Sequence, residues 1–147
     1  EGEVLVIPAK ALELGYRTSV IPKNGWIVLG AVLQLKKGDQ EQILARMEEL
    51  KEQRITKQPL DLPSAGSTFK RPEGYFAGKL IMDAGLRGFT VGGAQVSEKH
   101  CGFVVNRGNA TAADVWELIC EVKRRVKEMT GVELEPEVKL LGDFPQR

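Results

Sequence analysis

Several residue types and motifs are scarce in this 147-residue chain, and each scarcity excludes a class of protein. A single histidine leaves no histidine cluster to bind a metal and argues against a hydrolytic triad. The two cysteines, Cys101 and Cys120, fit no metal-ligand or disulfide pattern, which is typical of a reducing cytoplasm. The fingerprint Gly-x-Gly-x-x-Gly and the phosphate-binding P-loop are both missing, so neither a Rossmann fold nor a nucleoside triphosphatase is predicted.

Charge of one sign is not in excess either. Lysine and arginine total 21 against 20 acidic residues, so the net charge of +1 predicts neither nucleic acid nor an anionic membrane as a partner. No apolar run is long enough to cross a bilayer and no signal peptide is visible, which favours a cytoplasmic protein. The first residue is Glu1 rather than methionine, which indicates a processed chain or a piece of a longer one.

The first third of the sequence predicts strand, loop, strand and helix. Residues 3–7 are β-prone, and a polar loop follows at 15–19. Residues 26–35 form a long apolar run that predicts a buried strand. A helix is predicted from Asp39 onward, because apolar residues then recur at helical spacing. Residues 51–62 are charged and then contain proline, which indicates a linker between two lobes.

Two helices are predicted in the second lobe. The first covers about residues 75–84, with Phe76, Leu80 and Ile81 facing inward. The second is the clearest helix of the chain and runs from a capping box at Thr111 to a terminating glycine. Asp114 is the partner of Thr111 in the capping box, and Gly131 is the terminating glycine. The residues of the apolar face are Val115, Leu118, Ile119, Val122, Val126 and Met129.

The remaining segments of this lobe are β-prone. Residues 89–106 contain two such pieces among glycines, and shorter ones occur at 132–135 and 138–141, on either side of Pro136. Few strands, several helices and no regular βαβ alternation predict an α+β fold.

The loop at residues 63–72 has the most chemically suggestive pattern. It places Ser67 directly after a glycine and shortly before Lys70 and Arg71. A hydroxyl can give or take a proton, and two cations can hold an anion. The same residue types also build an ordinary turn, so the pattern alone leaves both interpretations open.

Three other places carry candidate reactive groups. These are the Tyr16-Arg17 pair, the run from Ser97 to His100, and Glu137. Each also has a structural interpretation: a surface cation beside a half-buried ring, a solvated turn, and an exposed carboxylate. From the residues alone, the prediction is a soluble α+β protein with a possible anion site.

Taken in order, four motifs resemble those of the UDP-N-acetylenolpyruvoylglucosamine reductases, flavoenzymes also called UDP-N-acetylmuramate dehydrogenases. The resemblance spans nearly the whole chain, and four spaced motifs in the right order are far more specific than any one of them. The motifs are Gly15-Tyr16-Arg17-Thr18-Ser19, Pro63 to Pro72, Gly92 to Thr111 and Leu134 to Lys139.

This resemblance implies a reaction and three catalytic residues. NADPH reduces FAD, and the reduced flavin passes a hydride to the enolpyruvyl group of a UDP-sugar. Ser67 would then protonate the resulting enolate, and Arg17 would hold the substrate carboxylate. Glu137 would assist at the same carboxylate in its protonated form, since an ionised acid would repel the enolate.

The resemblance also implies a set of substrate-binding residues. Tyr16, Lys70 and His100 match positions around the UDP-sugar, with His100 near its diphosphate. The roles of Arg71 and Lys139 stay open. The short segment after Arg17 resembles the subgroup that lacks an extra tyrosine-bearing loop.

The same comparison implies a domain division. Residues 1–56 would be the remnant of a second FAD-binding domain, 57–131 the C-terminal substrate-binding domain, and 132–147 a tail returning to a first FAD-binding domain. Nothing in this sequence corresponds to that first domain, so the chain alone is expected to be inactive. No metal is expected, and the alternative function is a non-catalytic sugar-nucleotide-binding fragment or pseudoenzyme.

Overall fold

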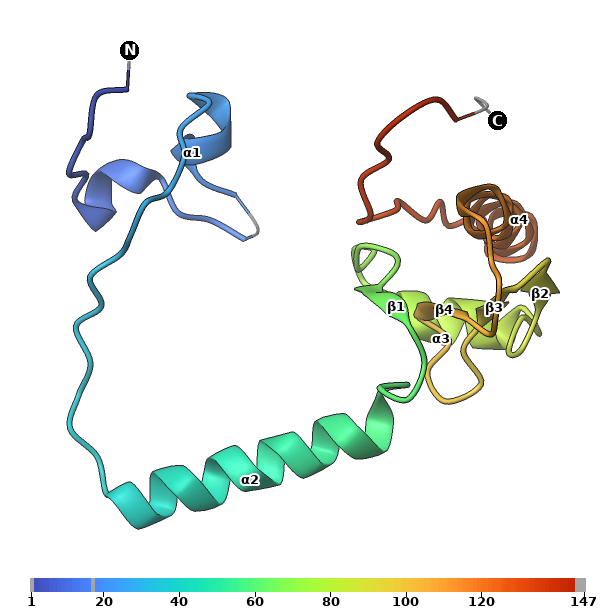
Figure 1. The fold of residues 1–147 in the computed structure, drawn as a ribbon, viewed down its shortest axis with the longest axis horizontal. Coiled ribbons are helices and arrows are strands. Elements are labelled where there is room, and N and C mark those ends of the chain that lie inside the picture. The colour runs from blue at the N-terminus through green and yellow to red at the C-terminus, as the bar shows by residue number, and fades with distance from the viewer. Residues whose placement is uncertain (1, 17, 145–147) are drawn as a thin grey trace. The chain divides into compact units, whose positions relative to one another are not determined.

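The computed structural model of the protein describes residues 2–16 and 18–144, which form parts of two compact units. The first unit is Glu1–Asp39 and the second is Gln40–Arg147. Figure 1 shows the elements of both units along the chain.

The first unit contains only short helical turns, η1 (Ala9–Leu12) and α1 (Val20–Lys23). The amide of Ile21 donates to the Ser19 hydroxyl, which caps α1. Among the described residues of this unit no strand forms, so the strands predicted at 3–7 and 26–35 are wrong for this chain. The second run is exposed instead of buried, with Val32 fully accessible. A strand needs a neighbour for its backbone hydrogen bonds, and no described strand pairs with this run.

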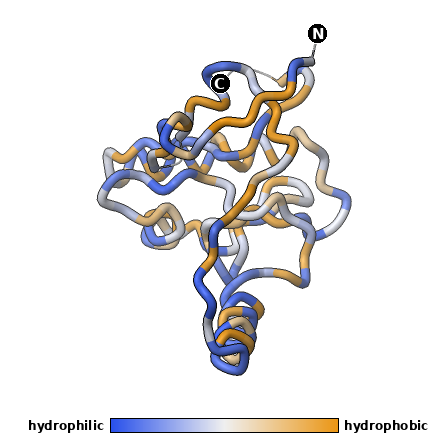
Figure 2. The backbone as a smooth tube through the Cα atoms, turned by 90° about the vertical axis from the view of Figure 1, so that its left-hand side faces the viewer, coloured by the Kyte–Doolittle hydropathy of each residue, from blue (hydrophilic) through white to orange (hydrophobic). Residues whose placement is uncertain are grey.

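The second unit begins with α2 (Gln40–Lys57), which confirms the helix predicted after Asp39. The helix continues through residues that were predicted to be linker, so the predicted linker at 51–62 is wrong as far as Lys57. No residue of α2 is buried, and Figure 2, which views this helix nearly end-on, shows both hydrophobic and hydrophilic residues on it. Near its C-terminal end, the backbone oxygen of Ile55 accepts a hydrogen bond from Lys99 Nζ at 2.7 Å.

A small antiparallel sheet forms the centre of the second unit. Its strands lie in the order β1-β4-β3-β2. Their bounds are β1 (Ser64–Ser67), β2 (Thr90–Val91), β3 (Ala94–Val96) and β4 (Phe103–Asn106). Three strands, β2, β3 and β4, form within residues 89–106, where two β-prone pieces were predicted, whereas β1 was predicted to be a loop.

Two helices complete the fold, which confirms the predicted α+β class. Helix α4 (Ala112–Thr130) contacts β2 and β3, and α3 (Ala77–Asp83) contacts α4 (Figure 1). The capping box at Thr111 forms as predicted, and hydrogen bonds from this residue lower the pKa of the Asp114 carboxyl. Gly131 ends α4 in the left-handed conformation with φ of 73°.

The helix faces differ from their predictions at two positions. Leu80 and Ile81 of α3 and four residues of α4 are buried in the core as predicted. Phe76 is not inward: it precedes α3 and is 60% exposed. Met129 lies in the last turn of α4 and is also exposed, because the core ends before that turn.

The segment after α4 packs against the same unit without forming a regular strand. Leu134 is completely buried in the core, and an isolated bridge joins Pro136 to Phe69. The predicted β-prone pieces at 132–135 and 138–141 are therefore not strands, although the first of them is firmly attached to the domain.

Candidate functional site

Ser67 lies at the end of β1, where the pairing with β4 is irregular. Ser64 is opposite Val105 and Ser67 is opposite Phe103, so the register shifts between these two pairs. Gly66 occupies the irregularity with φ of 88°, a conformation that L-residues rarely adopt. Such a bulge bends a strand and redirects the next side chain. Here it leaves Ser67 exposed at the end of the strand.

The Ser67 hydroxyl is only weakly engaged. It donates to the backbone oxygen of Phe69 across 3.5 Å, at the outer limit of a hydrogen bond. The hydroxyl proton can therefore turn toward a ligand at little energetic cost.

Thr68, the next residue, fixes the backbone beside this serine through hydrogen bonds to two different segments of the chain. Its amide donates to the oxygen of Gly102 at 2.8 Å, and its buried hydroxyl accepts from the amide of Val104 at 3.0 Å. On the other side, its backbone oxygen accepts from the amide of Glu137 at 2.9 Å. Thr68 thus joins Ser67 to β4 and to the segment after α4.

Glu137 is brought beside the serine segment by a pair of backbone bonds. Besides the bond from its own amide to Thr68, the amide of Lys70 donates to the oxygen of Glu135 at 2.8 Å. The side chains of Lys70 and Glu135 also form an ion pair at the surface. Glu137 is exposed, so two of the predicted catalytic residues, Ser67 and Glu137, lie on neighbouring segments and face solvent.

Arg71 is held by the residues that precede α3. Its guanidinium lies 4.0 Å from the centre of the Phe76 ring, and its Nε donates to the backbone oxygen of Tyr75 at 3.3 Å. An arginine stacked on an aromatic face keeps its charge while losing freedom of movement. The stacking partner Phe76 was missed by the sequence analysis, which assigned it to the core.

His100 lies in the turn between β3 and β4. Its Nδ1 accepts a hydrogen bond from the amide of Gly102 at 3.1 Å, and its ring meets the edge of Phe103 with centroids 5.1 Å apart. The amide of His100 donates to the hydroxyl of Ser97 at 3.2 Å. Ser97 is buried, and no motif in the sequence marked it as a support for His100.

The two remaining predicted residues belong to the first unit. Tyr16 is 79% exposed and lies in a tight turn closed by backbone bonds between Gly15 and Thr18. Arg17 lies outside the described residues. Because the two units are described separately, the convergence of Tyr16 and Arg17 with Ser67 stays a prediction.

Comparison with known proteins shows which family this chain belongs to. Residues 58–141, more than half of the chain, match the family described as UDP-N-acetylenolpyruvoylglucosamine reductase, C-terminal domain. The chain belongs to this reductase family.

Relatives in the reductase family match almost the whole chain. A reductase of Lachnoclostridium phytofermentans is 64% identical over 143 residues, which are 97% of this chain and 46% of that protein. One of Agathobacter rectalis is 58% identical over 144 residues, covering 98% of this chain and 46% of its own length. The crystal structure of the Thermus caldophilus reductase (MurB) matches with a TM-score of 0.70 and 44% identity, over 87% of this chain and 46% of that one. The chain thus spans less than half the length of these relatives.

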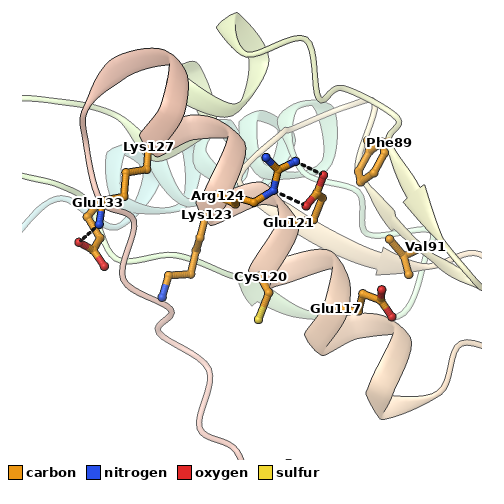
Figure 3. Close-up of a pocket in the computed structure, with 9 residues that line it drawn as sticks. All are labelled: Phe89, Val91, Glu117, Cys120, Glu121, Lys123, Arg124, Lys127 and Glu133. Atoms are coloured by element: carbon orange, nitrogen blue, oxygen red, sulfur yellow. Dashed lines mark hydrogen bonds and ion pairs between the residues drawn. The ribbon is translucent and has the colours of Figure 1, made fainter. Parts of the chain in front are cut away.

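Among the open pockets in the described part of this reductase-family chain, two are considered for a ligand site. The larger, of about 510 Å³, lies between α4 and the strand β2 (Figure 3). Two of its cations are already paired, Arg124 with Glu121 and Lys127 with Glu133. Arg124 and its neighbour Arg125 hold the pKa of the Glu121 carboxyl at about 2.

The smaller pocket, of about 360 Å³, is lined mainly by apolar and small residues beside Thr68. Neither of these two pockets is lined by a predicted catalytic residue. Within the described residues no three His, Cys, Asp or Glu side chains are grouped to hold a metal. None of the described helices is long and apolar enough to cross a membrane.

Proposed function

We propose that this chain forms the substrate-binding and proton-donating part of a reductase that converts UDP-N-acetylglucosamine enolpyruvate to UDP-N-acetylmuramate. This reaction would supply a precursor of peptidoglycan in the cytoplasm. The observation that supports the proposal best is the placement of Ser67 beside Glu137, through the bonds of Thr68, in a chain of this family.

The hydride would come from FAD that NADPH has reduced, bound by the part of the reductase that this chain does not span. The task left to this chain is to stabilise negative charge on the substrate and to protonate one carbon. Ser67 is exposed and weakly bonded, as a proton donor to an external carbanion must be. Serine is a poor acid, so its hydroxyl needs a strongly basic acceptor and a fixed position.

We assign the remaining site residues by role. Arg17 would bind the substrate carboxylate as charge develops, and Glu137 would donate to the same group in its protonated form. Tyr16, Lys70 and His100 would bind the UDP-sugar. The division of the reductase at residues 56 and 131 likewise remains a proposal.

The direct test joins this chain to the part of the Lachnoclostridium phytofermentans reductase that its match leaves out. We expect the fusion to bind FAD and to oxidise NADPH in a manner that depends on the enolpyruvyl substrate. The 147-residue chain alone is expected to purify without stoichiometric flavin and to be inactive. A fusion whose flavin is reduced by NADPH, and which binds UDP-sugar but never reduces it, would instead support the non-catalytic binding function.

A further inference from the structure

Two backbone hydrogen bonds join the residues that follow Ser67 to the segment after α4. The amide of Lys70 donates to the backbone oxygen of Glu135 at 2.8 Å, and the amide of Glu137 donates to that of Thr68 at 2.9 Å. One bond runs in each direction between the two segments, which is the pattern of an antiparallel pair. Lys70 and Glu135 are 65 residues apart in the sequence, so the tertiary fold and not a local turn sets this pairing.

Pro136 is tolerated in this pairing because of its position. It lies opposite Phe69, midway between the two bonds, where the amides of an antiparallel pair point away from the partner segment. Proline has no N–H, so it loses no bond there, whereas a shift of one residue would place it where a donor is needed. Pro136 therefore favours the observed register. We call the pairing of residues 68–70 with 135–137 the serine clip.

The burial of Leu134 decides which side chains reach the surface beside the clip. Leu134 is completely buried, and because side chains alternate along an extended segment, its neighbours Glu133 and Glu135 are exposed. Glu133 forms an ion pair with Lys127 of α4 at 3.0 Å (Figure 3), and Glu135 forms one with Lys70. The two glutamates thus attach one segment to two different places, the end of α4 and the serine clip.

The ion pair of Lys70 with Glu135 closes the clip on its exposed side. Side chains opposite each other in an antiparallel pair lie on the same face, so the ion pair adds to the backbone bond between the same two residues. The side chains are 46% and 68% exposed, so the pair has the modest strength of a solvated one. Glu137 lies in the same clip opposite Thr68, next to Ser67, so the contact that closes the clip also helps to hold Glu137 there.

We propose that Glu135 is a positioning residue of the reductase: its carboxylate binds Lys70 and thereby holds Glu137 beside Ser67, where both act on the enolpyruvyl group. This inference rests on the proposed function for the roles of Ser67 and Glu137, whereas the clip itself does not. An ammonium group has three donors, so Lys70 can bind Glu135 and an oxygen of the UDP-sugar at the same time.

The clip is tested in the 147-residue chain by amide hydrogen exchange. Glu135→Ala removes the carboxylate that binds Lys70, and the amides of Lys70 and Glu137 should then exchange about 3- to 5-fold faster, the effect of losing an exposed ion pair. Glu133→Ala is the matched control: it removes the neighbouring pair with Lys127 and should leave both amides unchanged. Unaltered exchange in Glu135→Ala, or an equal increase in both variants, would overturn the proposal.

The effect on the reaction is tested in the reductase fusion at saturating substrate. In Glu135→Ala, NADPH should reduce the flavin at the normal rate, while reoxidation by the enolpyruvyl substrate should be about 3- to 5-fold slower. Glu133→Ala should retain both rates. Because Glu135 acts through Lys70, the double variant Lys70→Met/Glu135→Ala should reoxidise no more slowly than Lys70→Met alone. A further slowing in the double variant by the same factor would show that Glu135 does not act through Lys70.

This proposal and the proposed function can fail separately. A fusion whose flavin is reduced by NADPH but never reoxidised by the substrate would contradict the proposed function, and the exchange rates would still show whether Glu135 holds Glu137 in place. An active fusion in which Glu135→Ala leaves reoxidation unaltered would contradict the positioning role alone.

Discussion

Thr68→Val is the substitution that most directly probes how the serine segment is anchored. Valine has almost the same shape as threonine, so the change removes one oxygen and leaves the packing intact. That oxygen accepts the amide of Val104 at 3.0 Å, and both residues are buried. The backbone bonds of Thr68 to Gly102 and Glu137 are not altered by the substitution.

The expected loss of stability in Thr68→Val comes from the amide of Val104, which is left without its hydrogen-bond acceptor. A buried donor without a partner costs about 1–3 kcal/mol of the free energy of unfolding. Thr68→Ser is the matched control, because it keeps the hydroxyl and removes one methyl group, worth about 0.8 kcal/mol. We therefore expect Thr68→Val to be the more destabilising of the two.

The assay combines urea unfolding with amide hydrogen exchange. The amide of Val104 should exchange faster in Thr68→Val than in Thr68→Ser, with the neighbouring amides of β4 following as the strand loosens. The reasoning would be refuted if Thr68→Ser destabilised the chain more than Thr68→Val, or if the Val104 amide stayed equally protected in both.

Two further predictions concern stability. Leu134→Ala should lower the free energy of unfolding by about 2–5 kcal/mol, because the side chain is fully buried, and should loosen the segment that carries Glu137. Leu141→Ala, at a leucine that is 89% exposed, is the control and should change stability by less than about 0.5 kcal/mol; equal losses would contradict the packing. Glu121→Gln should cost about 0.5–1 kcal/mol at pH 7, because it weakens the ion pairing with Arg124 and Arg125. Because the pKa of Glu121 falls from 4.5 to about 2 on folding, the pair stabilises above pH 4.5 and is lost as pH falls toward 2, so the gap between variant and parent should shrink over that range and a constant gap would argue against it.

Local signals in the sequence were sufficient for α4. The capping box at Thr111 and the glycine at position 131 act within a few residues of each helix end, and both form as predicted. The same holds for Leu80 and Ile81 of α3, whose helical spacing identifies the buried face.

Strands were harder to predict because their stability depends on partners elsewhere in the chain. Residues 26–35 have the composition of a buried strand, yet no described strand pairs with them. The reverse applies to β1, whose serines, alanine and glycine have low β-propensity but which pairs with β4. Pairing with a neighbour decides the outcome at both places.

The candidate site was predictable as residues but not as an arrangement. Motif resemblance picked out Ser67 and Glu137, and the structure shows their segments side by side. The contacts that support them come from Thr68, whose buried hydroxyl accepts from the amide of Val104 and whose backbone oxygen accepts from the amide of Glu137, both far along the chain. No spacing rule along the sequence could have identified those bonds.

The measurement that tests the central claim most directly separates the two half-reactions of the reductase fusion. In the Ser67→Ala variant, NADPH should reduce the bound flavin at the normal rate, while reoxidation by the enolpyruvyl substrate should be lost. Ser64→Ala, which removes an exposed hydroxyl from the same strand, is the matched control and should retain both half-reactions. If Ser67→Ala retained rapid reoxidation by the substrate, Ser67 would not be the proton donor.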